Sequence, residues 1–183
     1  MRRISLSMFV LFALCSSATF ASDRRTAVDT VRGFYQRYLS YDLSKFPETP
    51  LPTIPLSKAF SAEVTKTAAI CNLYGEGPCG WGAAGDKYLD AQEIDPILSY
   101  SNSRITIREI MPGTVQVKLN VYPSARDAGD FYDRMITYKM VMEHGSYVVD
   151  DVAYADGVSM RKKLLSERAY SWAYPRQDAA GNK

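Results

Sequence analysis

Residues 135–154 read M-I-T-Y-K-M-V-M-E-H-G-S-Y-V-V-D-D-V-A-Y, and their pattern is that of a β-hairpin. Side chains alternate across 135–142, where Ile136 and Tyr138 share one face with two methionines. A period of two residues is typical of a strand whose faces have different surroundings. Residues 143–146, E-H-G-S, supply a tight turn into a second strand that runs to residue 154.

A second hairpin is expected upstream of the first. Residues 105–110 and 115–121 both alternate apolar and polar side chains, and Met111-Pro112-Gly113 lies between them. Proline and glycine are residues that turns favour. Because the four strands follow one another without a long crossover, we expect a meandering antiparallel sheet.

Helical periodicity appears on both sides of these strands. Apolar residues recur every three or four positions over 25–41, and again from Ser57, a suitable N-cap, to the glycines that begin at Gly75. Prolines within 46–55 predict an extended connector, and 158–170 predict a closing helix. The order indicates an α+β fold, with two N-terminal helices and one C-terminal helix packed on one side of a curved antiparallel sheet of about four strands.

Residues 1–21 have the layout of a secretory signal peptide. Arg2 and Arg3 precede an apolar run that is too short to span a membrane, and small residues precede the expected cut. We expect cleavage after Ala21, or alternatively after Ala18. The mature chain would then lie in the periplasm without a transmembrane segment.

The length and charge of the mature chain limit what it can be. The chain of 183 residues suits one domain, which we place at 22–172 and follow with a flexible tail at 173–183. Loss of Arg2 and Arg3 with the leader leaves 20 basic residues against 20 acidic ones. This balance disfavours nucleic acid as a partner, since nucleic-acid binding draws on an excess of positive charge.

Two cysteines, Cys71 and Cys79, remain after cleavage, because Cys15 lies in the leader. An even pair in an oxidising compartment predicts a disulfide bond. Eight residues of continuous helix would hold them about 12 Å apart, too far to bridge, so the helix must end within 75–78. A redox-active or metal-binding pair is less favoured, because the spacing is not C-x-x-C. We expect no bound metal and no cofactor.

Asp150 and Asp151 are the best candidates for acid–base chemistry. Strict alternation would send their side chains to opposite faces of the strand, so at most one could enter a concave cavity. There desolvation would raise its pKa and suit it to general acid or base catalysis, with Tyr138 as another polar group of the cavity. The competing interpretation is that both aspartates bond to turn amides or stay exposed. We therefore identify no catalytic residue.

The single histidine and the glycine-rich segment give weaker indications of function. His144 is the only histidine and lies in a predicted turn, where a solvated side chain is expected and no triad signature accompanies it. Five glycines within 75–85 lack the Gly-Lys-Ser/Thr ending of a phosphate loop, and they follow a helix rather than a strand. We expect an irregular loop that the disulfide holds at its base.

Several stretches resemble a bacterial family known as domain of unknown function 3828. They are F-Y-Q-R-Y-L at 34–39, D-P-I at 95–97, V-D-D-V-A-Y-A-D-G at 149–157, and Leu164-Leu165. The resemblance covers most of residues 25–170. It implies a small exported protein with a cone-like, cystatin-like fold similar to that of nuclear transport factor two. The chain departs from the family in having Tyr147 where a tryptophan is expected and in lacking a lipobox, and the family supplies no catalytic residues.

These observations favour a binding protein over an enzyme. Thirteen tyrosines and two tryptophans suit a surface for protein contacts. The first hypothesis is a non-enzymatic periplasmic protein-binding module, for example an immunity protein that neutralises a periplasm-acting type VI secretion toxin, or an accessory subunit of an envelope complex. The alternative is a small-molecule carrier or enzyme that uses the cone cavity with Asp150 or Asp151. A structural role in the envelope is a third possibility.

Overall fold

The structure, a computed structural model, describes residues 25–41, 49–74, 79–83, 85–125 and 127–173. Its elements are the helices α1 (Ala27–Tyr38), α2 (Lys58–Tyr74) and α3 (Met160–Ala173), and the strands β1 (Thr106–Met111), β2 (Thr114–Asn120), β3 (Asp133–Glu143) and β4 (Ser146–Ala153). The strands form one antiparallel sheet in the order β1-β2-β3-β4. The predicted α+β fold with a curved sheet is confirmed. The expected signal peptide and almost all of the expected tail lie outside the described residues.

Both predicted hairpins are present. The β3–β4 turn places His144 and Gly145 at positive φ (50° and 81°), as the mirror-image turns of tight hairpins require. The His144 side chain is exposed, as expected. In the β1–β2 turn, Gly113 also has positive φ, and an added Cβ would lie 2.9 Å from the Met140 carbonyl oxygen. Glycine is therefore required where this turn meets β3.

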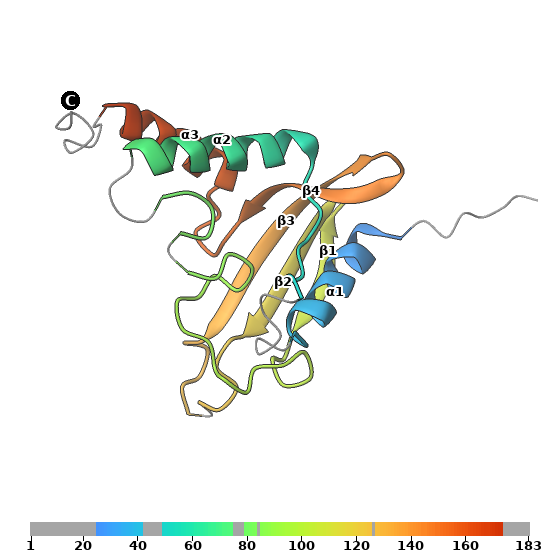
Figure 1. Ribbon diagram of the computed structural model, residues 1–183. Helices are drawn as coiled ribbons and strands as arrows, with labels where there is room; N and C mark the ends of the chain where they lie inside the picture. The colour runs from blue at the N-terminus through green and yellow to red at the C-terminus, as the bar shows by residue number, and fades with distance from the viewer. Residues whose placement is uncertain (1–24, 42–48, 75–78, 84, 126, 174–183) are drawn as a thin grey trace, which may run out of the picture.

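Helix α1 crosses one face of the sheet and buries its apolar side there (Figure 1). A capping box between Thr26 and Asp29 fixes its first turn. Phe34 and Tyr35 are fully buried in one core cluster with the inward-facing side chains of β2 and β3. The opposite face of the sheet carries exposed lysines such as Lys118. The predicted alternation of β2 and β3 thus matches a sheet with one covered face.

Helices α2 and α3 pack against each other at the β4 edge (Figure 1). The chain before α2 runs along that edge, where the Ser57 amide donates to the Val149 carbonyl and the Val149 amide donates to the Pro55 carbonyl, both at 2.8 Å. Arg168 of α3 is buried and forms an ion pair with Glu63 of α2. No helix of the described chain is both long and apolar enough to cross a bilayer.

A disulfide joins Cys71 to Cys79, with the two Cα atoms 5.7 Å apart. Cys71 lies in the last turn of α2, and the chain leaves the helix before Cys79, as the spacing argument requires. In the chain-entropy account, a ring of this size stabilises the folded state by about 2–3 kcal/mol. The disulfide thereby ties the end of α2 to the glycine-rich segment that follows.

Candidate functional site

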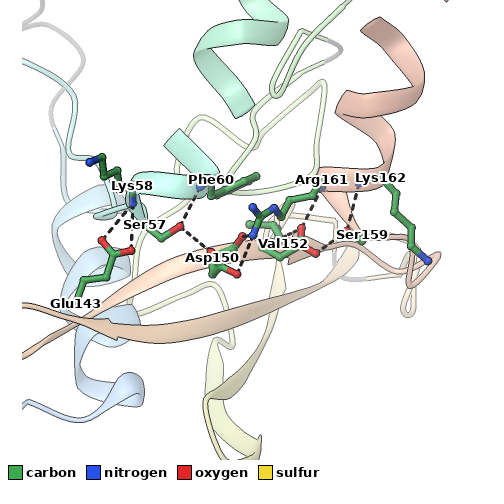
Figure 2. A network of polar contacts seen from close by, with 10 residues as sticks. Ser57, Lys58, Phe60, Glu143, Asp150, Val152, Ser159, Arg161 and Lys162 are labelled. Carbon is green, nitrogen blue, oxygen red and sulfur yellow. Dashed lines mark hydrogen bonds and ion pairs between the residues drawn. The ribbon is translucent and has the colours of Figure 1, made fainter. Parts of the chain in front are cut away.

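Asp150 and Asp151 lie at a β-bulge in β4. Lys139 of β3 pairs with Asp151, whereas its neighbour Met140 pairs with Val149, so Asp150 is the additional residue. Val149 and Val152 are consequently both buried in the core, although they are three positions apart. The expectation that the two aspartates face opposite sides of the strand is wrong, because the bulge resets the alternation. The Asp150 carboxylate contacts residues at the starts of both α2 and α3 (Figure 2), and the Asp151 carboxylate contacts residues at the start of α3.

Asp150 connects the two helix starts. The Ser57 hydroxyl donates to Asp150 at 2.7 Å and accepts from the Phe60 amide at 2.9 Å, so Ser57 is the predicted N-cap of α2. The second carboxylate oxygen of Asp150 receives the Arg161 guanidinium of α3 at 2.9 Å. Asp150 therefore joins the cap of one helix to the first turn of the other.

Asp151 serves the start of α3 in the same way. Its carboxylate accepts the Ser159 hydroxyl and the backbone amides of Arg161 and Val152, the last two at 3.1 and 2.9 Å. The Ser159 oxygen in turn accepts from the Lys162 amide at 3.3 Å. Two adjacent carboxylates thus hold two serine caps at positive helix ends, where negative charge is favourable. We call Asp150, Asp151, Ser57 and Ser159 the double cap (Figure 2).

Tyr138, the third predicted cavity residue, lies in the buried core and pairs across the sheet with Val152, next to Asp151. It is fully buried, and its hydroxyl is 2.9 Å from that of Tyr35, which also donates to the Tyr88 carbonyl at 2.6 Å. Burial raises the pKa of both phenols above the usual value, so neither is an acid or base at neutral pH. These side chains fill the inner face of the sheet at the place where the sequence suggested a cavity.

Two concave features lie instead around residues 79–92, a segment that overlaps the irregular loop predicted at 75–85. Trp81 is 9% exposed, and its indole N–H donates to the Tyr154 hydroxyl, which donates to the Lys87 carbonyl, both at 2.8 Å. Gly85 has positive φ, and an added Cβ would lie 2.6 Å from the Ala91 carbonyl oxygen. The loop is thus folded around the Trp81 side chain, and glycine is required at position 85 because the backbone there passes close to Ala91.

Lys87 is the charged group that this loop leaves available. Its ammonium nitrogen lies 4.9 Å from the ring centre of Trp81 and 5.1 Å from that of Tyr88, within the range of cation–π attraction. Burial lowers the pKa of Lys87, and the charge of Asp86 opposes this only in part. Among the described residues, the ammonium has neither an ion pair nor a hydrogen bond. Lys87 is therefore a partly desolvated cation beside two aromatic rings.

The Asp86 carboxylate is already engaged. It accepts the hydroxyl of Tyr38 and the backbone amides of Tyr88 and Leu89, at 2.8 and 3.1 Å for the amides. These bonds close the turn that presents Lys87. Asp86 therefore acts within the loop and does not pair directly with the lysine.

Two clefts flank Lys87. The first, of about 390 Å³, lies between the loop and α3, and the second, of about 340 Å³, lies between the loop and residues 51–53. Asp90 lines the first cleft, and burial raises the pKa of its carboxyl, with Arg134 and Lys163 acting in the opposite direction. The sequence feature that marks this region is the cluster of glycines around Trp81.

Metal chemistry finds little support in the described part of the chain. The only close group of three potential metal ligands there is Cys71, Cys79 and Glu167. The two sulfurs are joined in the disulfide, so they are not thiolate ligands. What the loop offers is a cation, aromatic walls and space, which suit binding.

Comparison with known proteins identifies no family. No protein-family model matches this chain, and no curated protein matches it. A solved crystal structure of a protein of unknown function from Bacteroides thetaiotaomicron VPI-5482 is similar, with 16% identity and a TM-score of 0.40, over 69% of this chain and 88% of that one. The resemblance to domain of unknown function 3828 therefore remains a prediction.

Proposed function

We propose that this protein is a non-enzymatic module of the bacterial periplasm that acts by binding another protein. One observation carries the proposal. The polar groups that suggested a catalytic cavity have structural partners, whereas large apolar side chains lie on the surface. Asp150 and Asp151 hold helix caps, and Tyr138 is bonded within the core.

The most exposed aromatic side chain of the described residues marks the surface that we assign to binding. Phe131 is 74% exposed in the loop before β3, and its ring lies edge-on to Tyr132, which stacks on Tyr122. Stacked aromatic rings provide rigid apolar contact area at low entropic cost. We call Tyr122, Phe131 and Tyr132 the aromatic loop.

An exported protein-binding module could have one of two specific roles. One is an immunity protein that neutralises a toxin delivered into the periplasm, such as a type VI secretion effector, and the other is an accessory subunit of an envelope complex. The signal-peptide pattern of residues 1–21 and the disulfide are compatible with both. In each form the partner is a protein, and no catalysis is needed.

The test is affinity capture of the full chain, expressed with its own leader and a C-terminal tag in its own organism. We expect one protein at equimolar amounts, lost with Phe131→Ser and kept with Met111→Ser. Met111 is a matched control because it is 61% exposed and lies in the β1–β2 hairpin, at the other end of the sheet. Thermal unfolding must show both variants folded. Absence of any equimolar protein would overturn the proposal.

The immunity form has its own test. Deletion of the gene should make cells sensitive to neighbouring cells that deliver the toxin, and expression of the wild-type protein should restore protection. A deletion strain that grows equally well beside such neighbours would exclude immunity and leave the accessory subunit.

A further inference from the structure

The second cleft beside Lys87 has the features of a small-molecule site. Its apolar walls come from Leu51 and Pro52 on one side and from the rings of Trp81 and Tyr88 on the other. Leu51 is 42% exposed, so one wall is open to incoming ligand. A volume of about 340 Å³ is at the lower end of the range for small-ligand sites.

One charged group of this cleft is available to bind a ligand. The Lys87 ammonium is held against two rings, is partly desolvated and has no carboxylate partner among the described residues. An ammonium carries three donors and no acceptor. Its pairing with an anion is stronger beside apolar walls than in open water, because the local dielectric is lower. The cleft is therefore suited to an anion.

The surroundings restrict the anion to a single charge. Asp86 also lines the cleft and would repel a second negative charge, although its oxygens are engaged within the loop. Lys87 is the only cation among the described residues that line this cleft, and Lys163 lines the other cleft and pairs with Asp156 at 2.8 Å. Phosphate groups, which gain from two or more cations, are therefore poorly matched. A carboxylate is well matched.

We propose that this cleft binds a small organic acid with one carboxylate on an apolar group. The carboxylate meets the Lys87 ammonium, and the apolar group lies between Leu51, Pro52 and the Trp81 ring. Thr53 also lines the cleft and carries a hydroxyl, which is a further donor group. This site is separate from the aromatic loop, and it does not depend on the proposed protein partner.

Phenylacetate is the probe, and phenylacetamide is its neutral counterpart of nearly equal shape. A Trp172→Phe background leaves Trp81 as the only tryptophan, so its fluorescence and its indole N–H resonance report on the cleft. We expect saturable binding of phenylacetate with a Kd of about 1 mM, since the ligand has few atoms. Phenylacetamide should bind at least about tenfold more weakly, because it cannot form the charged pair.

Variants test the role of the lysine. Lys87→Met keeps most of the apolar stem and should weaken phenylacetate binding at least about tenfold, whereas Lys87→Arg keeps the charge and should retain binding. Lys118→Met is the matched control, because Lys118 is exposed on the opposite face of the sheet. Thermal unfolding confirms that each variant is folded.

Three results would overturn the proposal: equal binding of phenylacetate and phenylacetamide, unchanged binding in Lys87→Met, or no phenylacetate binding at all. An acidic peptide serves as a separate probe. If it binds through Lys87 and phenylacetate does not, the small-acid site is refuted and the cleft belongs to a protein partner. If the Lys87→Met variant still captures the protein partner in the affinity experiment, the proposed function stands even if this small-acid site is refuted.

Discussion

Replacement of Asp151 by alanine is predicted to destabilise the fold strongly. Its two carboxylate oxygens accept three hydrogen bonds, from the amides of Val152 and Arg161 and from the Ser159 hydroxyl (Figure 2). Alanine removes all three bonds together and leaves two backbone amides without their acceptor. It also removes a negative charge from the start of α3.

The size of the effect follows from these contacts. Each hydrogen bond contributes about 1 kcal/mol to the net free energy of unfolding, and the charge at the helix end adds about 0.5 kcal/mol. Asp151→Ala should therefore cost about 3–4 kcal/mol, or about 6–16 °C in Tm for a domain of this size. In Asp151→Asn, one oxygen can still accept from Val152 and Arg161, so the loss should be only about 1–2 kcal/mol.

Urea unfolding followed by circular dichroism measures these differences at constant m-value. Asp130→Ala is the control, because Asp130 is exposed in a loop, and it should change stability by less than about 0.5 kcal/mol. The reasoning would be refuted if Asp151→Ala cost less than about 1 kcal/mol, or if the alanine and asparagine variants were equally stable.

Two further predictions concern buried polar groups. Tyr35→Phe should lower the free energy of unfolding by about 2 kcal/mol and Tyr138→Phe by about 1 kcal/mol, because the Tyr35 hydroxyl has two hydrogen-bond partners and that of Tyr138 has one. Urea unfolding measures both values, and equal losses of stability would contradict the assigned network. Hydrogen bonds lower the pKa of Asp95, chiefly the one from Ser124 and then the one from the Ile97 amide. The contribution of Asp95 to stability is therefore present above the unfolded pKa near 4, and it is lost as the pH falls through the lower folded pKa. The stability difference between wild type and Asp95→Asn should therefore shrink from about pH 5 to pH 2, and a difference independent of pH would refute this assignment.

The local features of the fold were predictable because each depends on near neighbours in the chain. Alternation around Tyr138 and the turn at Gly145 predicted the β3–β4 hairpin, and Ser57 predicted the start of α2. The spacing of Cys71 and Cys79 required the helix to end between them, and it does.

The candidate site was predictable only in part. Asp150 and Asp151 were singled out as candidate cavity residues, whereas their roles as partners of helix caps depend on two helices that are distant in sequence. Lys87 gave no signal, because a lysine after an aspartate in a glycine-rich segment is ordinary. Its importance comes from Trp81 and Tyr88, which lie against its ammonium.

Sequence pattern alone specified the order of helices and strands, the two hairpin turns and the covalent link. These features obey short-range rules of backbone geometry, capping and chain reach. Tertiary structure alone specified the direction of the Asp150 side chain, the closed interior around Tyr138 and the cleft at Lys87. A single inserted residue at the bulge reverses a face, and a cleft needs walls from segments far apart, so both are set by the packing of the whole domain.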